Sequence, residues 1–194
     1  MTLNELDALR DENQTLRLRV AALENQLESI RIQRVAQDFL ETHGLVDEPY
    51  FIRRLHESVL SAERYARFVT LVMVVLPGEK GENEGNNSSL ESAARLRAEL
   101  RQTDLVGYSN SGRIFILLEE SDPSRRFRPL RRVTREIMDY PHPHYALANY
   151  PNDSSRDDTL LEIVSARTSD LRARISNQTD PVVHTGEAVL SLFN

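Results

Sequence analysis

Arg101 and Asp104, three residues apart in the chain, form the most suggestive pair of side chains in this sequence. A guanidinium can fork onto a phosphate through two parallel hydrogen bonds, and a carboxylate can accept N–H donors from the same ligand. These two types of side chain could therefore contact a phosphorylated ligand. The alternative is structural, because an arginine at a helix end and an aspartate at a strand start are ordinary capping and ion-pair residues.

A second group of arginines crowds one predicted helix. Its members are Arg125, Arg126, Arg128, Arg131, Arg132 and Arg135. They could form a face that binds an anion or a partner protein, although such a run is more often a solvated helix surface. Of the 24 basic residues in the chain only Lys80 is a lysine, so the arginines reflect a general bias as well as a suitability for phosphate.

Other combinations of reactive side chains are weaker. His142 and His144 flank Pro143 and could touch a metal, but no third ligand is near in the sequence, so an exposed turn is the favoured interpretation. Ser109, Ser111 and His56 lack the spacing of a hydrolytic triad. The chain has no cysteine and hence no disulfide or thiolate metal site. The sequence predicts no metal site and no cofactor.

Composition restricts the class of protein. The 194 residues suffice for one compact domain and an extension, and the net charge of −6 argues against a general nucleic-acid binder. The longest apolar run, residues 68–76, is too short to span a bilayer. No signal peptide is visible at the N-terminus. We expect a soluble cytoplasmic protein, without nucleic-acid or membrane-spanning function.

The N-terminal stretch has the heptad pattern of a coiled coil. Residues 3–41 contain neither glycine nor proline, and two seven-residue series offset by three run through them for four heptads. The seam consists of Leu6, Leu9, Asn13, Leu16, Val20, Leu23, Leu27 and Ile30. A single asparagine at an a position favours a parallel dimer, in which it can pair with its own copy.

Charges beside this seam support the same orientation. A parallel, in-register pair would place Glu5 opposite Arg10, Glu12 opposite Arg17, and Arg19 opposite Glu24. Each exposed pair contributes only a few tenths of a kcal/mol, so their role is to specify orientation. We expect a homodimer through this helix; the alternative is a single amphipathic helix folded back on the globular domain.

Further along the chain, helices and strands alternate around a hairpin. Residues 68–76 read as a central strand covered on both faces, residues 77–89 as a polar loop and residues 104–118 as two strands joined by a tight turn. Helices are expected from residue 48, over 90–100, over 122–138 and over 157–174, with a strand at 145–150. This order predicts an α+β fold, a mostly antiparallel sheet flanked by helices with a ferredoxin-like core.

The hairpin and the segments beside it resemble the GGDEF domain of diguanylate cyclases. Residues 43–48 stand where that family has Thr-Gly-Leu-x-Asn-Arg, and residues 101–106 match its Arg-x-x-Asp-Leu-Val. Residues 149–153, followed by Leu160 and Leu161, resemble its Tyr-Pro-x-Asp and Leu-Leu. The place of Gly-Gly-Asp-Glu-Phe is taken by Asn110, Ser111, Gly112, Arg113 and Ile114. A coiled coil leading into the domain is also typical of the family.

The departures from the family pattern concern its metal chemistry. Such cyclases use two metal ions held by acids at the first strand end and in the hairpin tip. Here the strand ends in Leu76 and Pro77, and the tip presents Gly112 and Arg113 instead of Asp and Glu. The resemblance therefore implies that the chain is not an enzyme. A residual nucleotide hydrolase is the remaining enzyme hypothesis, with Glu79, Glu82 and Glu84 as candidate metal ligands.

In the family, the Arg-x-x-Asp before the motif binds cyclic di-GMP as a product inhibitor. The resemblance thus gives Arg101 and Asp104 a specific ligand: the arginine would bind a phosphate or guanine O6 and N7, and the carboxylate would accept guanine N–H groups. The first hypothesis is a catalytically inactive signalling or scaffold protein that is a cyclic di-GMP receptor. The alternative is a nucleotide-independent module that binds an unknown protein through the arginine-rich helix or the C-terminal tail.

The predicted division of the chain follows from these patterns. Residues 1–42 form the dimerisation helix, residues 43–178 the degenerate GGDEF-like domain and residues 179–194 a tail that could be an added strand or a docking segment.

Overall fold

The computed structural model describes residues 14, 16–24, 26, 37–76, 86–120, 127–136, 142–175, 180–186 and 188–193. Two compact units divide the chain, residues 1–39 and residues 40–194. In the first unit the described residues are helical, and all of them except the half-buried Phe39 are exposed. Within the described residues, no helix combines the length and apolar character that crossing a membrane requires.

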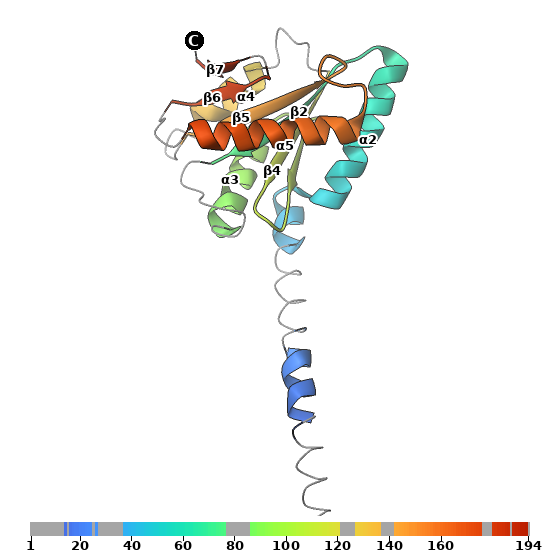
Figure 1. The fold of residues 1–194 in the computed structure, drawn as a ribbon, viewed down its shortest axis with the longest axis vertical. Coiled ribbons are helices and arrows are strands. Elements are labelled where there is room, and N and C mark those ends of the chain that lie inside the picture. Colours follow the sequence, from blue (N-terminus) through green and yellow to red (C-terminus); the bar gives the residue numbers. More distant parts are fainter. Residues whose placement is uncertain are drawn as a thin grey trace, which may run out of the picture. The chain divides into compact units, whose positions relative to one another are not determined.

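The second unit is a mixed sheet with helices on both faces (Figure 1). Its helices are α2 (Glu48–Tyr65), α3 (Asn86–Glu99), α4 (Phe127–Glu136) and α5 (Asp157–Arg174). Its strands are β1 (Val46–Asp47), β2 (Val69–Val75), β3 (Leu105–Tyr108), β4 (Ile114–Glu119), β5 (His144–Tyr150), β6 (Val182–His184) and β7 (Val189–Ser191). Among the described residues these seven strands form one sheet in the order β1-β3-β4-β2-β5-β6-β7. The α+β fold class with a mostly antiparallel sheet is confirmed.

The centre of the sheet is β2, as its apolar sequence predicted. All seven of its residues are buried, and it pairs antiparallel with β4 on one side and β5 on the other. Because side chains alternate along a strand, Leu71 and Met73 point to one face and Val72 and Val74 to the opposite one. A strand that is buried on both faces needs this continuous apolar run.

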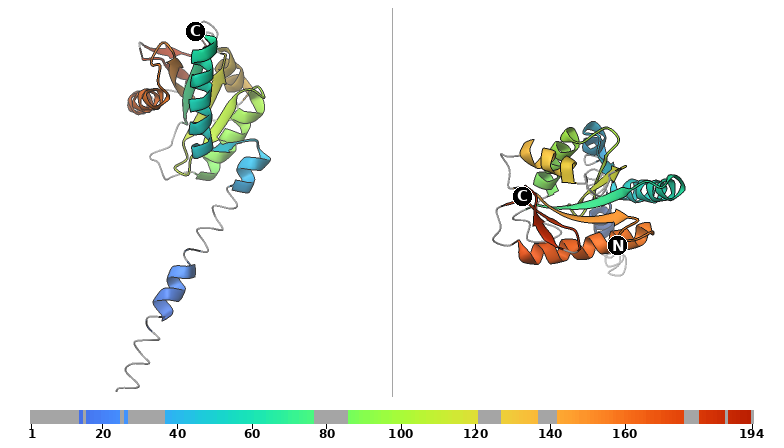
Figure 2. Two further views of the ribbon diagram at one scale, coloured as in Figure 1. Left: turned by 90° about the vertical axis from the view of Figure 1, so that its right-hand side faces the viewer. Right: turned by 90° about the horizontal axis from the view of Figure 1, so that it is seen from above.

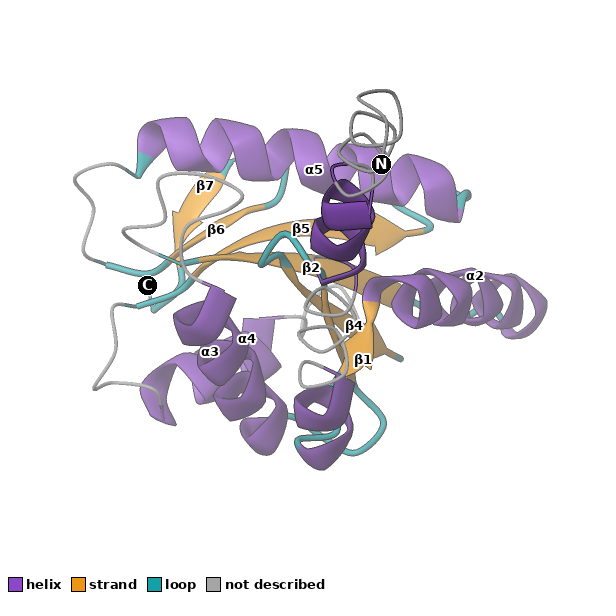
Figure 3. Ribbon diagram, turned by 90° about the horizontal axis from the view of Figure 1, so that it is seen from below, coloured by secondary structure: helices purple, strands orange, loops and turns teal. Residues whose placement is uncertain are grey.

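Different helices cover the two faces of the sheet. The helix α5 lies across one face, and α3 and α4 lie on the opposite one (Figure 3). The helix α2 runs alongside the strands (Figure 2) and shares one buried cluster with α5, in which Phe51, Leu55, Leu160 and Val164 meet the sheet. Gly107 of β3 permits this packing, because a Cβ there would lie 2.6 Å from the Phe51 ring.

Local signals explain how α2 begins. Gly44 has a φ of +66°, which fits its predicted place after a helix end, and the short strand β1 follows. The Asp47 carboxylate then accepts a hydrogen bond of 2.9 Å from the Tyr50 backbone N–H, and Pro49 stands in the first turn. These are standard N-terminal helix features, which is why the start of α2 at residue 48 was predictable.

Two boundaries differ from the sequence prediction. The polar loop expected through Ser89 is wrong over residues 86–89, which are the first turn of α3. A tertiary contact explains this, because the Ser89 hydroxyl lies 2.9 Å from the Tyr108 hydroxyl and both residues are buried. His144 belongs to β5 instead of an exposed turn. The tail supplies β6 and β7 at the edge of the sheet, which agrees with the added strand that was one of its two predicted alternatives.

Candidate functional site

The hairpin tip between β3 and β4 is a self-contained turn. Gly112 has a φ of +81°, and its N–H donates to the Ser109 carbonyl at 2.9 Å. The Ser109 hydroxyl accepts a 2.9 Å bond from the Arg113 N–H and lies 2.9 Å from the Ser111 hydroxyl. The strand register places Ile114 opposite Val74, so the tip lies beside the C-terminal end of β2.

Arg113, which follows the glycine of this turn, interacts with three neighbouring side chains. One terminal nitrogen donates to both Glu48 carboxylate oxygens, at 3.0 and 3.3 Å, and Nε donates to the Ser111 hydroxyl at 3.0 Å. The guanidinium carbon also lies 5.7 Å from the centre of the Phe115 ring. The predicted cation at the tip is therefore neutralised by a carboxylate from the start of α2.

Acidic metal ligands do not gather in the described residues. No group of three or more His, Cys, Asp or Glu side chains there could hold a metal ion. The candidate ligands Glu79, Glu82 and Glu84 lie outside the described residues, so the structure places none of them.

Arg101 and Asp104 come together as a tight turn between α3 and β3. The Asp104 N–H donates to the Arg101 carbonyl at 3.0 Å, and the Asp104 carboxylate accepts a 3.1 Å bond from the Arg101 N–H. Asp104 is only 5% exposed, whereas Arg101 is exposed. The carboxylate closes the turn, and the guanidinium is the part of the pair that solvent and ligands can reach.

Two further arginines that the sequence analysis did not connect with this turn lie around it. Arg97 donates to the Arg101 carbonyl at 2.9 Å, and Arg132 of α4 donates to the Glu99 carbonyl at 2.7 Å. Burial raises the pKa of Asp104, while the bond from the Arg101 backbone and the charges of Arg101, Arg132 and Arg97 act in the opposite direction. The turn thus contains a buried carboxylate on which the charges of three nearby arginines act. Only the contact of α4 with α3 brings Arg132 here, and no sequence spacing could show it.

The six arginines predicted on one helix fall into two groups. Arg128, Arg131, Arg132 and Arg135 line one surface hollow on α4, together with Glu136. Arg125 and Arg126 lie outside the described residues.

The histidine pair does not form a metal site. His144 is fully buried, and its Nδ1 accepts a hydrogen bond of 3.3 Å from the Val182 N–H. In the neutral ring Nε2 must then carry the proton, so it has no lone pair for a metal. Burial and the nearby His142 lower the pKa of His144 to about 4, which keeps the ring neutral.

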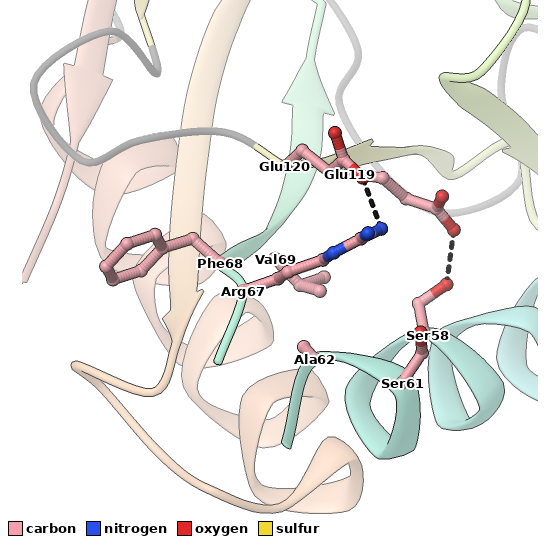
Figure 4. Close-up of a pocket in the computed structure, with 8 residues that line it drawn as sticks. All are labelled: Ser58, Ser61, Ala62, Arg67, Phe68, Val69, Glu119 and Glu120. Atoms are coloured by element: carbon pink, nitrogen blue, oxygen red, sulfur yellow. Dashed lines mark hydrogen bonds and ion pairs between the residues drawn. The ribbon is translucent and has the colours of Figure 1, made fainter. Parts of the chain in front are cut away.

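A small pocket lies at the opposite end of β2, between α2 and the end of β4 (Figure 4). Its polar groups satisfy each other: Ser58 donates to Glu119 at 2.6 Å, and Arg67 pairs with Glu120. Its volume of about 30 Å³ is enough for roughly one or two water molecules, so it does not fit a nucleotide.

Asp153 is a polar centre whose role the sequence analysis missed, although it lies in one of the quoted motif blocks. Its carboxylate accepts a 2.8 Å bond from the Asn149 N–H and pairs with Arg167 of α5. Burial alone would raise the pKa of Asp153, but the bonds from Arg167 and Asn149 outweigh burial and lower it. These contacts join the end of β5 to α5, so the residue has a structural function.

Comparison with known proteins identifies the fold. No family model and no curated protein matches the chain. Among solved structures, the GGDEF domain of YfiN (TpbB) from Pseudomonas aeruginosa has a TM-score of 0.58 at 16% identity, over 68% of this chain and 92% of that one. The coiled coil and GGDEF domain of DgcB from Caulobacter crescentus, in complex with c-di-GMP, has a TM-score of 0.54 at 14% identity, over 82% and 95%. The diguanylate cyclase SiaD of P. aeruginosa, in complex with its activator SiaC, has a TM-score of 0.54 at 17% identity, over 88% and 78%.

These similarities correct the prediction that the chain is not an enzyme. Structures that share its fold belong to diguanylate cyclases, which are enzymes. The residues Gly112 and Arg113 at the hairpin tip therefore do not exclude catalysis. The resemblance itself is confirmed: the globular unit of this chain has the fold of the GGDEF domains of diguanylate cyclases.

Proposed function

We propose that this chain is a cytoplasmic signalling protein that binds cyclic di-GMP at the turn between α3 and β3. The observation that carries the proposal is the placement of Arg101, Arg97 and Arg132 around the buried Asp104 carboxylate. Cyclic di-GMP presents two phosphodiester groups and two guanine bases. Guanidinium groups suit both, since they fork onto phosphate oxygens and onto guanine O6 and N7.

The geometry suggests different roles for the two motif residues. Arg101 is exposed and would contact the ligand directly. Asp104 has little exposed surface, so it would act as a positioning residue that holds the turn and the surrounding arginines. Arg97 and Arg132 each donate to backbone carbonyl groups and retain further N–H donors for a phosphate.

The N-terminal heptads fit a receptor that works as a pair. In this proposal residues 1–42 form a parallel coiled coil, and two copies of the globular domain are presented together. Leu16, Val20 and Leu23 are 52–54% exposed in a single protomer, as seam residues without a partner helix would be. The solved structure of DgcB that contains a coiled coil was obtained in complex with c-di-GMP, which supports the combination of the two features.

Calorimetric titration of the full chain with cyclic di-GMP tests the ligand. We expect saturable binding by the wild type and an affinity at least about tenfold lower for Arg101→Ala, because a charge-assisted hydrogen bond is worth about 1.5–3 kcal/mol. Arg132→Gln should also weaken binding. Arg64→Ala, which removes an exposed arginine from α2, is the control and should bind as the wild type does. Absence of binding by the wild type would refute the proposal.

A further inference from the structure

The arginine-rich surface of α4 is a separate feature of the same domain. Arg128, Arg131, Arg132 and Arg135 line a hollow of about 360 Å³, with Glu136 as its one acidic member. The helix contains these four arginines and this one glutamate, hence a charge of +3, in a chain whose net charge is −6. The positive charge is therefore local, and it is concentrated around a concave site.

Close ion pairs with carboxylates account for little of this charge within the described residues. Arg128, Arg132 and Arg135 form no ion pair with a carboxylate of the described residues. Like charges at spacings of three and four residues lie side by side on a helix and repel each other. A bound anion would relieve this repulsion among the four guanidinium groups.

The opposite side of α4 is firmly attached to the sheet. Leu130, Val133 and Thr134 are fully buried. The Thr134 hydroxyl donates to the Leu130 carbonyl at 2.7 Å and lies 2.8 Å from the hydroxyl of Tyr145, a fully buried residue of β5. The arginines are thus presented by a helix that cannot rotate easily about its axis.

The end of the chain orients two of these arginines. Arg131 Nε donates to the Leu192 carbonyl at 2.6 Å, and the Arg135 guanidinium lies 5.5 Å from the centre of the Phe193 ring. The chain end after β7 lies beside α4 (Figure 1). The arginine-rich helix and the tail, which the sequence presents as unrelated features, therefore form one surface. Orientation before binding reduces the entropy that a ligand must overcome.

We propose that this hollow binds a compact ligand with two or more linked phosphate groups, without a metal ion, and that the residues after β7 preorganise it. Several guanidinium forks around one small space match closely spaced phosphate oxygens. The volume is in the range of small-molecule sites. The hollow is lined by residues of a single helix, so it matches a compact anion better than an extended nucleic acid or an acidic protein. The ligand class is a polyphosphate, free or attached to a nucleoside.

This site shares Arg132 with the proposed cyclic di-GMP site, so the test uses Arg128 and Arg135, which belong to the hollow alone. We would titrate the full chain with sodium tripolyphosphate, ATP and adenosine in EDTA by calorimetry. Tripolyphosphate and ATP should bind with affinities that fall as salt rises, and adenosine should not bind. Sulfate at equal ionic strength distinguishes a site for linked phosphates from general anion binding.

Variants locate the site. Arg128→Gln/Arg135→Gln should lower the tripolyphosphate affinity at least about tenfold. The matched control is Arg53→Gln/Arg64→Gln, which removes two exposed α2 arginines that also lie over aromatic rings and changes the net charge equally. It should leave the affinity within about twofold of the wild type. Phe193→Leu should lower the affinity severalfold with no change of charge, and thermal unfolding verifies that each variant is folded.

Three outcomes would overturn this inference: no binding of tripolyphosphate by the wild type, equal losses in the α4 and α2 double variants, or tighter binding of sulfate or a poly-glutamate peptide than of tripolyphosphate. Cyclic di-GMP titrations of the same proteins separate the two proposals. Arg128→Gln/Arg135→Gln should keep cyclic di-GMP binding, and Arg101→Ala should keep tripolyphosphate binding. If one of the two ligands does not bind, that result does not contradict the proposed site for the other ligand.

Discussion

Arg113 and Glu48 exchange the charges that the GGDEF pattern has at these two positions. In the register of the resemblance, the family carries glutamate where this chain has Arg113 and arginine where it has Glu48. The two side chains meet at 3.0 Å although 65 residues separate them. Both are about one third exposed, so solvent weakens their attraction without removing it. In this chain the two residues form an ion pair between the hairpin tip and the start of α2.

A double-mutant cycle on this pair tests that interpretation. We expect Glu48→Arg and Arg113→Glu each to lower the free energy of unfolding by roughly 1 kcal/mol, because each leaves two like charges in contact. The double variant Glu48→Arg/Arg113→Glu should recover part of the loss, with a coupling of about 0.5–1 kcal/mol. Recovery should be incomplete, because an arginine in the first turn of α2 opposes the helix dipole. Urea denaturation of the four proteins gives the result, and additive losses would contradict the pairing.

At the scale of elements, the C-terminal strands are attached to the domain through histidine side chains as well as the sheet. His144 of β5 accepts the Val182 N–H, and His184 of β6 lies 2.9 Å from the Asp170 carboxylate of α5. The His184 Nδ1 in turn accepts a 3.0 Å bond from the Gly186 N–H. The hairpin of β6 and β7 is therefore held by hydrogen bonds to two imidazole rings as well as by strand pairing.

Acid should weaken this attachment. The folded-state pKa of His144 is about 4 against an ordinary 6.5, so the unfolded chain binds a proton that the folded chain rejects between these values. The contribution of His144 to stability is therefore present above about pH 6.5 and is lost as the pH falls towards 4, with an upper limit of about 3 kcal/mol. His144→Asn, which keeps an acceptor for Val182 but cannot titrate, should flatten this part of the pH profile in urea denaturation. An unchanged slope in the variant would show that other groups are responsible.

At the scale of the whole molecule, the two units of the chain differ in how much apolar surface each can bury by itself. The globular unit buries an apolar cluster between α2, α5 and the sheet. The N-terminal unit offers only a stripe of apolar residues, and an isolated amphipathic helix of this kind is marginal in water. Pairing with a second copy would bury the stripe, which is the basis of the proposed homodimer. Leu6, Leu9, Asn13, Leu27 and Ile30 of the seam lie outside the described residues.

Sedimentation of the full chain tests the dimer. We expect the wild type to be dimeric at micromolar concentrations and Asn13→Leu to shift the population towards higher oligomers, because a buried asparagine at an a position disfavours them. Leu16→Asp/Leu23→Asp should instead give monomers, since it places charges in the seam. Leu18→Asp, at a described position outside the seam, is the control and should remain dimeric. A monomeric wild type would exclude the coiled coil.

The amino-acid sequence by itself determined the parts of this protein that depend on local geometry. Alternation and apolar runs located β2, the hairpin and β5, and capping residues located the start of α2. The same kind of information indicated the α+β class. Local chemistry suffices for these features, because propensity and capping act within a few residues.

Only the tertiary structure decided which distant side chains meet. Strand register brings Arg113 to Glu48, the contact of α3 with α4 brings Arg132 to the Arg101 turn, and the added strands bring Leu192 to Arg131. Burial also changed the interpretation of single residues. In the folded chain Asp104 is a buried residue that closes a turn, and His144 is a buried hydrogen-bond acceptor. Contacts of this kind depend on how the sheet and the helices pack. The number of residues between two side chains in the sequence does not tell how far apart they lie in the folded chain.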